Sequence, residues 1–152
     1  MLAIGRQKFE DTGNATALRM VRGDATGLGI ADEQFDVITI SFGIRNVVDV
    51  MAALSEMYRV LNPGGRLLVL EFSLPSNAVL RWAYLLYFRN VLPLIGGMVS
   101  GDSHAYRYLN RTVETFPYGE AFAAHVRDAG FSDVKFHPLT FGIAMIYQGD
   151  KI

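Results

Sequence analysis

Polar side chains that could serve chemistry follow two apolar runs of the chain. Ser41-Phe42-Gly43-Ile44-Arg45-Asn46 comes after the β-branched run 35–40, and the lone acid Glu71 ends the run Leu67–Leu70. In open parallel sheets, ligands collect at the carboxyl ends of the strands, so these residues are candidates for a site. Arg45 offers hydrogen-bond donors to a ligand, but by itself a solvated ion pair with a nearby acid such as Asp49 is the simpler interpretation.

Glu71 and the segment around Asp24 also have two interpretations each. Glu71 could orient Arg45 or act on a substrate hydroxyl, or it could be a structural carboxylate that accepts N–H groups from Phe72-Ser73. Asp24 and Ala25 follow an expected strand at Leu18–Arg22, where they could face a ligand, or Gly23–Thr26 could simply form a turn.

The expected elements alternate between helix and strand. Helical spacing predicts a helix over Val50–Val60, ended by Asn62-Pro63-Gly64-Gly65 before a strand at Leu67–Glu71. Phe35–Ser41 is expected to be a buried strand. This alternation indicates an α/β fold with parallel strands.

The second half of the chain follows a different pattern. An apolar, aromatic helix is expected at Asn77–Val91, broken by Pro93 and Gly96-Gly97. Two further helices are expected at 102–112 and 118–129. Strands at 133–138 and 141–148 are joined too tightly for a crossover helix, so they must pair antiparallel.

Composition restricts the possible function. The chain of 152 residues is one domain by size, with 51% hydrophobic residues and a net charge of −1. That charge balance argues against nucleic acid as a partner. The absence of cysteine excludes thiolate catalysis and cysteine-ligated metal, and three dispersed histidines do not suggest a metal site. Met1–Gly5 shows no start of a signal peptide, so a cytoplasmic protein is expected.

Three segments together resemble a known family. FDVITISFGIRNVVDV at Phe35–Val50, RVLNPGGRLLVLEFS at Arg59–Ser73 and AGFSDVKF at Ala129–Phe136 are similar to the ubiquinone/menaquinone C-methyltransferases of the UbiE family. That resemblance implies an S-adenosylmethionine (SAM) cofactor and methyl transfer to a ring carbon of a polyprenylated benzoquinol or naphthoquinol. Asn62 departs from it, because the family usually carries Lys or Arg there.

The resemblance also implies a Rossmann-like fold with strand order 3-2-1-4-5-7-6. Its first two strands and Gly-rich SAM loop have no counterpart here, and a helix at Leu2–Phe9 would follow the second strand. We therefore expect a single, N-terminally shortened methyltransferase domain over 1–152. The alternative is a non-catalytic, methyltransferase-like module that acts as a partner or scaffold.

The family's cofactor contacts carry over to three positions. Asp24 and Ala25 would face the adenine of SAM, and Ser41 would contact the cofactor. The chemistry that the resemblance implies gives a task to three more residues: Arg45 and Asn46 could stabilise the phenolate that develops on the substrate ring, and Glu71 could orient Arg45 or act on a substrate hydroxyl. The apolar stretch 77–99 would contact an isoprenoid tail or the inner-membrane surface, or be buried in a dimer. Without the first two strands of the family fold, the strand at 35–41 would have an unpaired edge. A second chain could cover it, so we also expect a homo-oligomer.

Overall fold

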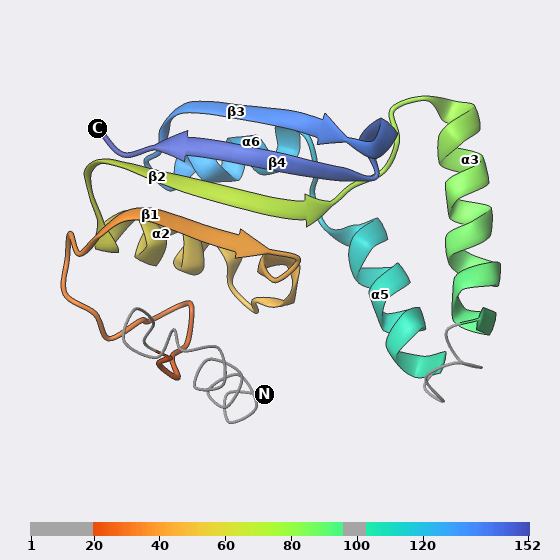
Figure 1. The fold of residues 1–152 in the computed structure, drawn as a ribbon, viewed down its shortest axis with the longest axis horizontal. Helices are drawn as coiled ribbons and strands as arrows, with labels where there is room; N and C mark the ends of the chain where they lie inside the picture. The colour runs from red at the N-terminus through yellow and green to blue at the C-terminus, as the bar shows by residue number, and fades with distance from the viewer. Residues whose placement is uncertain (1–19, 96–102) are drawn as a thin grey trace, which may run out of the picture.

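A four-stranded mixed sheet forms the centre of the molecule (Figure 1). The computed structural model describes residues 20–95 and 103–152, with the side chains of 103–107 left out of that description. β1 is parallel to β2, whereas β4 is antiparallel to β2 and β3, in the spatial order β1-β2-β4-β3. The strands are β1 (Phe35–Ser41), β2 (Leu61–Phe72), β3 (Ser132–Leu139) and β4 (Ala144–Asp150). The expected α/β sheet with a C-terminal antiparallel hairpin is confirmed, as is the 4-5-7-6 part of its strand order.

Two helices cover one face of this sheet (Figure 1). α2 (Val50–Val60) has the predicted bounds and buries Leu54 and Met57 against β2. α6 (Glu120–Asp128) buries Phe122 and Val126 against β3 and β4. Their apolar faces meet the sheet in one hydrophobic core, so the helical period of the sequence translates directly into burial.

The Pro63-Gly64-Gly65 segment is a bulge in β2 rather than a loop before it. β2 begins at Leu61, six residues before the predicted start. Phe35 of β1 pairs with Leu61 and Val37 pairs with Arg66, so extra residues on β2 bulge out between these pairs. A Cβ atom on Gly65 would lie 2.8 Å from the carbonyl oxygen of Asn62. Glycine therefore lets the chain turn tightly without leaving the sheet.

β1 is an edge strand among the described residues, in agreement with the bare edge expected at 35–41, but the prediction that the strand is buried is wrong. Within the described residues only β2 pairs with it, and Val37 remains 54% exposed. Residues 20–22 of the strand expected at Leu18–Arg22 are not in a strand, whereas Leu18, Arg19 and the helix expected at Leu2–Phe9 lie outside the described residues. Propensity and apolar runs predict a strand, but burial depends on what packs against it.

A second helical layer stands beyond one end of the sheet (Figure 1). α3 (Ala78–Leu86) continues into the π-helical turn η2 (Tyr87–Val91), and residues 92–95 are helical. Pro93 therefore does not end the helix as predicted, and the π turn directly before it provides the irregular geometry that accommodates a proline. α5 (Ser103–Thr115) packs beside η2, where Asn110 Nδ2 donates to the Phe88 carbonyl at 2.6 Å.

Candidate functional site

The carboxyl ends of β1, β2 and β3 lie at one edge of the sheet. These three strands run in the same direction, since β4 is antiparallel to both β2 and β3. The 3-10 turn η1 (Ile44–Asn46) follows β1, Ser73 follows β2, and the 3-10 turn η3 (Thr140–Gly142) follows β3. The topology thus brings three loops from distant parts of the sequence to the edge where ligands bind in such folds.

Arg45 and Glu71 form a buried ion pair at this edge. Arg45 Nη1 lies 2.6 Å from Glu71 Oε1, and their side chains are 9% and 1% exposed. Glu71 also accepts the Phe72 backbone N–H at 2.8 Å and the Arg45 backbone N–H at 3.4 Å. The expected pair between Arg45 and Asp49 does not form. Asp49 instead caps α2 by accepting the Ala52 N–H at 2.9 Å.

Glu71 therefore makes two of its predicted contacts. It accepts a backbone N–H as a structural carboxylate does, and it is paired with Arg45. The Arg45 Nη1 atom also donates to the Phe42 carbonyl at 2.8 Å, and the guanidinium carbon lies 5.2 Å from the centre of the Phe72 ring. Arg45 Nε is buried without a hydrogen-bond partner among the described residues. The guanidinium is thus fixed by Glu71, the Phe42 carbonyl and the Phe72 ring, while its Nε–H donates no hydrogen bond to the described residues.

Asn46 is tied to α5. Its Oδ1 accepts a hydrogen bond from the Tyr108 hydroxyl at 3.2 Å, which connects η1 to a helix 62 residues further along the chain. The sequence places Tyr108 on a helix but cannot show that this helix faces η1. The contact leaves the Asn46 amide nitrogen without a partner within the described part of the chain.

An open cleft of about 660 Å³ brings Asp24, Ala25 and Asn46 together. Its lining comes from residues 22–26 and 46–48. Ser41 is not among the lining residues and lies exposed at the end of β1. Two of the three predicted cofactor residues and one predicted catalytic residue therefore share one cleft, next to the Arg45–Glu71 pair.

Asp24 closes a tight turn on the wall of the cleft. Its Oδ1 accepts the Thr26 backbone N–H at 2.9 Å and the Thr26 hydroxyl at 2.8 Å, so the expected turn is confirmed. These hydrogen bonds, the backbone one first, lower the pKa of the Asp24 carboxyl. Its second oxygen accepts none of the hydrogen bonds found among the described residues. A carboxylate acceptor is therefore available to a ligand in the cleft.

Glu56 anchors the loop that follows Asp24, which the sequence did not reveal. Its Oε2 accepts the Leu28 N–H at 3.0 Å, and both of its oxygens accept hydrogen bonds from Arg59. The Arg59 hydrogen bond, followed by that from Leu28, lowers the pKa of Glu56 to about 2. Helical spacing correctly directs Glu56 away from the core. The long-range contact with Leu28 has no local signal in the sequence.

The sequence profile of the ubiE/COQ5 methyltransferase family matches residues 1–151. The chain belongs to this family. It is 49% identical over 152 residues to the ubiquinone/menaquinone biosynthesis C-methyltransferase UbiE of Dinoroseobacter shibae, covering 100% of this chain and 61% of that protein. It is also 49% identical to the demethylmenaquinone methyltransferase of Thermus thermophilus, covering 99% of this chain and 67% of that protein.

A eukaryotic relative matches over the same region. The mitochondrial 2-methoxy-6-polyprenyl-1,4-benzoquinol methylase of Xenopus laevis is 45% identical, with 100% of this chain and 49% of that protein covered. The chain thus spans between about half and two thirds of the length of these curated relatives.

Solved structures share the fold at low identity. The [4+2]-cyclase SpnF matches with a TM-score of 0.69 and 16% identity, covering 99% of this chain and 62% of that one. PigF, solved with SAH, matches with a TM-score of 0.64 and 20% identity, covering 99% of this chain and 40% of that one. These matches establish the Rossmann-like methyltransferase fold.

Two further kinds of feature are not found within residues 20–95 and 103–152. No helix there has both the length and the hydropathy to cross a bilayer. Nor does that part of the chain gather three or more His, Asp or Glu side chains into a set of metal ligands.

Proposed function

We propose that this chain carries the catalytic edge of a SAM-dependent C-methyltransferase that acts on a ring carbon of a polyprenylated benzoquinol or naphthoquinol. Membership of the ubiE/COQ5 family and the names of its relatives support this class of reaction. The single observation that carries the proposal is the Arg45–Glu71 pair, buried at the carboxyl edge of the sheet beside a cleft lined by Asp24 and Ala25.

The residues of the cleft fit an adenosyl cofactor. The free oxygen of Asp24 suits the exocyclic amine of adenine, and the Ala25 backbone N–H suits a ring nitrogen. A volume of about 660 Å³ is within the range typical of cofactor sites. SAM, when bound, supplies an electrophilic methyl group on a sulfonium. Ser41 lies exposed at the carboxyl end of β1, outside this lining, so its contact with the cofactor rests on the family resemblance alone.

Arg45 and Asn46 would act on the substrate ring. Carbon methylation requires an electron-rich ring, so a quinol hydroxyl must acquire phenolate character as the ring carbon attacks. The guanidinium of Arg45, whose side chain is 9% exposed, and the amide nitrogen of Asn46 are donors that could stabilise this developing charge. Because the charge is largest in the transition state, these hydrogen bonds would increase turnover more than substrate affinity.

Glu71 would serve as a positioning residue for Arg45. Its carboxylate already accepts hydrogen bonds from Arg45 Nη1, the Arg45 backbone and the Phe72 backbone. An acceptor so fully engaged is poorly placed to take a proton from the substrate. Its contribution would be to fix the guanidinium plane before the substrate arrives.

The surface of α3 supports contact with a membrane or with a second copy. Val79, Trp82 and Leu86 are exposed on this helix, and no acidic residue occurs between Asn77 and Ile95. An apolar, aromatic surface with basic side chains suits the interface of an anionic bilayer, where a polyprenylated substrate resides. Within the described residues the edge of β1 opposite β2 is unpaired, which supports the expected homo-oligomer.

Methyl transfer from labelled SAM to a short-tailed quinol tests the proposal, with Arg45→Lys and Arg111→Lys as matched variants. Lysine keeps the charge but loses the planar donor geometry. We expect Arg45→Lys to lower turnover by roughly 10²-fold with little change in SAM affinity measured by calorimetry, while Arg111→Lys leaves both unchanged. SAM binding without methyl transfer in the unmodified chain would favour the non-catalytic module.

A further inference from the structure

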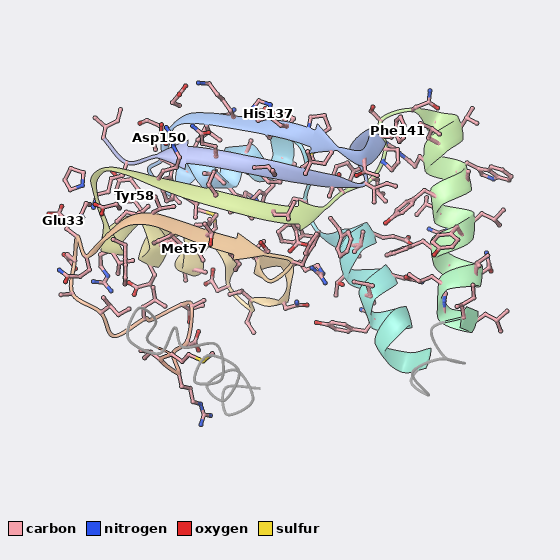
Figure 2. The ribbon with its side chains drawn as sticks, viewed as in Figure 1. Glu33, Met57, Tyr58, His137, Phe141 and Asp150 are labelled. Carbon is pink, nitrogen blue, oxygen red and sulfur yellow. The ribbon has the colours of Figure 1, made fainter. Side chains whose placement is uncertain are left out.

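An apolar groove lies between the β3–β4 hairpin and the first turns of α3. Its volume is about 480 Å³. Figure 2 shows Phe141 at the end of the hairpin that faces α3. The lining residues include no charged side chain, and the only polar ones are Ser76 and Asn77 at the start of the helix. Its apolar walls come from Leu80, Phe136, Pro138, Phe141 and Met145.

The groove is attached to the strand that carries Glu71. Met145, on its wall, is the cross-strand partner of Glu71 in the β2–β4 ladder. Ser73, two residues after Glu71, is fully buried and donates its backbone N–H to the Ile143 carbonyl at 2.8 Å. Its hydroxyl also donates to the Gly142 carbonyl. The base of the groove and the candidate reaction site therefore share one rigid framework.

The turn at the end of the hairpin holds an aromatic ring out in solvent. Thr140 and Phe141 both have left-handed backbone conformations, with φ of 48° and 58°. A β-branched residue rarely adopts this conformation, and consecutive strained residues persist where the surroundings hold them. Gly142 packs so closely that an added Cβ would lie 3.3 Å from the Pro75 Cα atom. Phe141 therefore lies at the rim of the groove and is 83% exposed.

We infer that this groove binds the first isoprene units of the substrate's polyprenyl tail. The inference rests on the proposed function and extends it to a subsite for the tail. A lining without charge is complementary to a neutral hydrocarbon, which would lose affinity next to any unpaired charge. The groove is open to the surface at Leu80, which is 45% exposed, so such a chain has a way in.

Binding of free isoprenoid alcohols of increasing length tests the subsite in the full chain. Trp82 is the only tryptophan of the protein and lies on the helix that carries Leu80, so a change in its fluorescence during the titration provides a first measurement. With prenol, geraniol and farnesol, which contain one, two and three isoprene units, we expect affinity to rise by about 10-fold per unit until the groove is full. Calorimetry provides a second measurement that does not depend on the tryptophan.

Two neighbouring residues supply a matched pair of variants. Leu80→Gln places an amide in the wall of the groove, whereas Val79→Gln changes the adjacent exposed residue that does not line it. We expect Leu80→Gln to weaken farnesol binding by about 10-fold and Val79→Gln to change it by less than about 2-fold. Phe141→Ala, at an exposed position, should weaken binding without unfolding the protein.

Several outcomes would overturn the inference. Equal losses in Leu80→Gln and Val79→Gln would assign the surface to general membrane contact, and affinities independent of chain length would remove the tail subsite. If the protein is a dimer that Leu80→Gln dissociates and farnesol leaves intact, the occupant of the groove is a second copy of the chain.

Methyl transfer to a tailless quinol separates the proposed tail subsite from the proposed function. If it occurs while farnesol affinity is flat, only the subsite fails. If selective farnesol binding occurs without any methyl transfer, only the proposed function fails.

Discussion

The guanidinium of Arg45 and the carboxylate of Glu71 join the ends of two parallel strands across a distance of 2.6 Å. The two residues are 26 positions apart in the sequence, and α2 and the bulged start of β2 lie between them. Burying two charges is costly, and their attraction repays this cost only when the geometry is good and the remaining donors and acceptors are satisfied. Glu71 meets that condition. Arg45 meets it only in part, because its buried Nε has no hydrogen-bond partner among the described residues.

Replacing Glu71 with Gln should destabilise the protein. The neutral amide cannot compensate the buried guanidinium of Arg45, and breaking a buried pair on one side typically costs about 3–5 kcal/mol. Urea unfolding followed by circular dichroism measures the change. The double variant Arg45→Met/Glu71→Gln removes both charges and should recover a large part of the loss. Additive losses in the double variant would show that the two side chains do not act as a pair.

The anchor between Glu56 and Leu28 should be lost in acid. The pKa of Glu56 is lowered from 4.5 to about 2 in the folded protein. A depressed folded pKa means that its stabilising contribution is complete above about pH 4.5 and disappears as the pH falls towards about 2. The ¹⁵N–¹H resonance of the Leu28 backbone should therefore shift with a midpoint near the folded pKa of Glu56, about 2. In Glu56→Gln this titration should be absent, while Glu120→Gln, which alters an exposed pair with Arg127, should retain it.

The edge of β1 should mediate self-association. Val37 is exposed on a strand that pairs only with β2 among the described residues, and an unpaired apolar edge is a template for a second chain. We expect light scattering at micromolar concentration to report a dimer or larger assembly, and Val37→Lys to shift it towards the monomer. Val48→Lys introduces the same charge at a fully exposed site outside β1 and should leave the assembly unchanged. A monomeric unmodified protein would contradict the prediction.

The sequence by itself determined the order and type of most elements. Helical spacing from Val50 to Val60 and the alternation of helix with apolar strand are local signals, and they predicted α2, β1, most of β2 and the antiparallel pairing of β3 with β4. The FGIRN segment and Glu71 could be chosen as site candidates because their position after apolar runs is also local. The sequence segments that resemble the UbiE family were enough to name the family correctly.

Only the tertiary structure decided which side chains contact one another. The choice of Glu71 over Asp49 for Arg45 depends on β1 and β2 being parallel neighbours, which places the two loops together, while Asp49 is occupied as the cap of α2. The contacts from Tyr108 to Asn46 and from Leu28 to Glu56 span 62 and 28 residues and leave no periodic trace in the sequence. The exposure of β1, the bulge at Gly65 and the helix through Pro93 likewise depend on neighbouring chain segments. Long-range packing selects one among several conformations that local propensity permits.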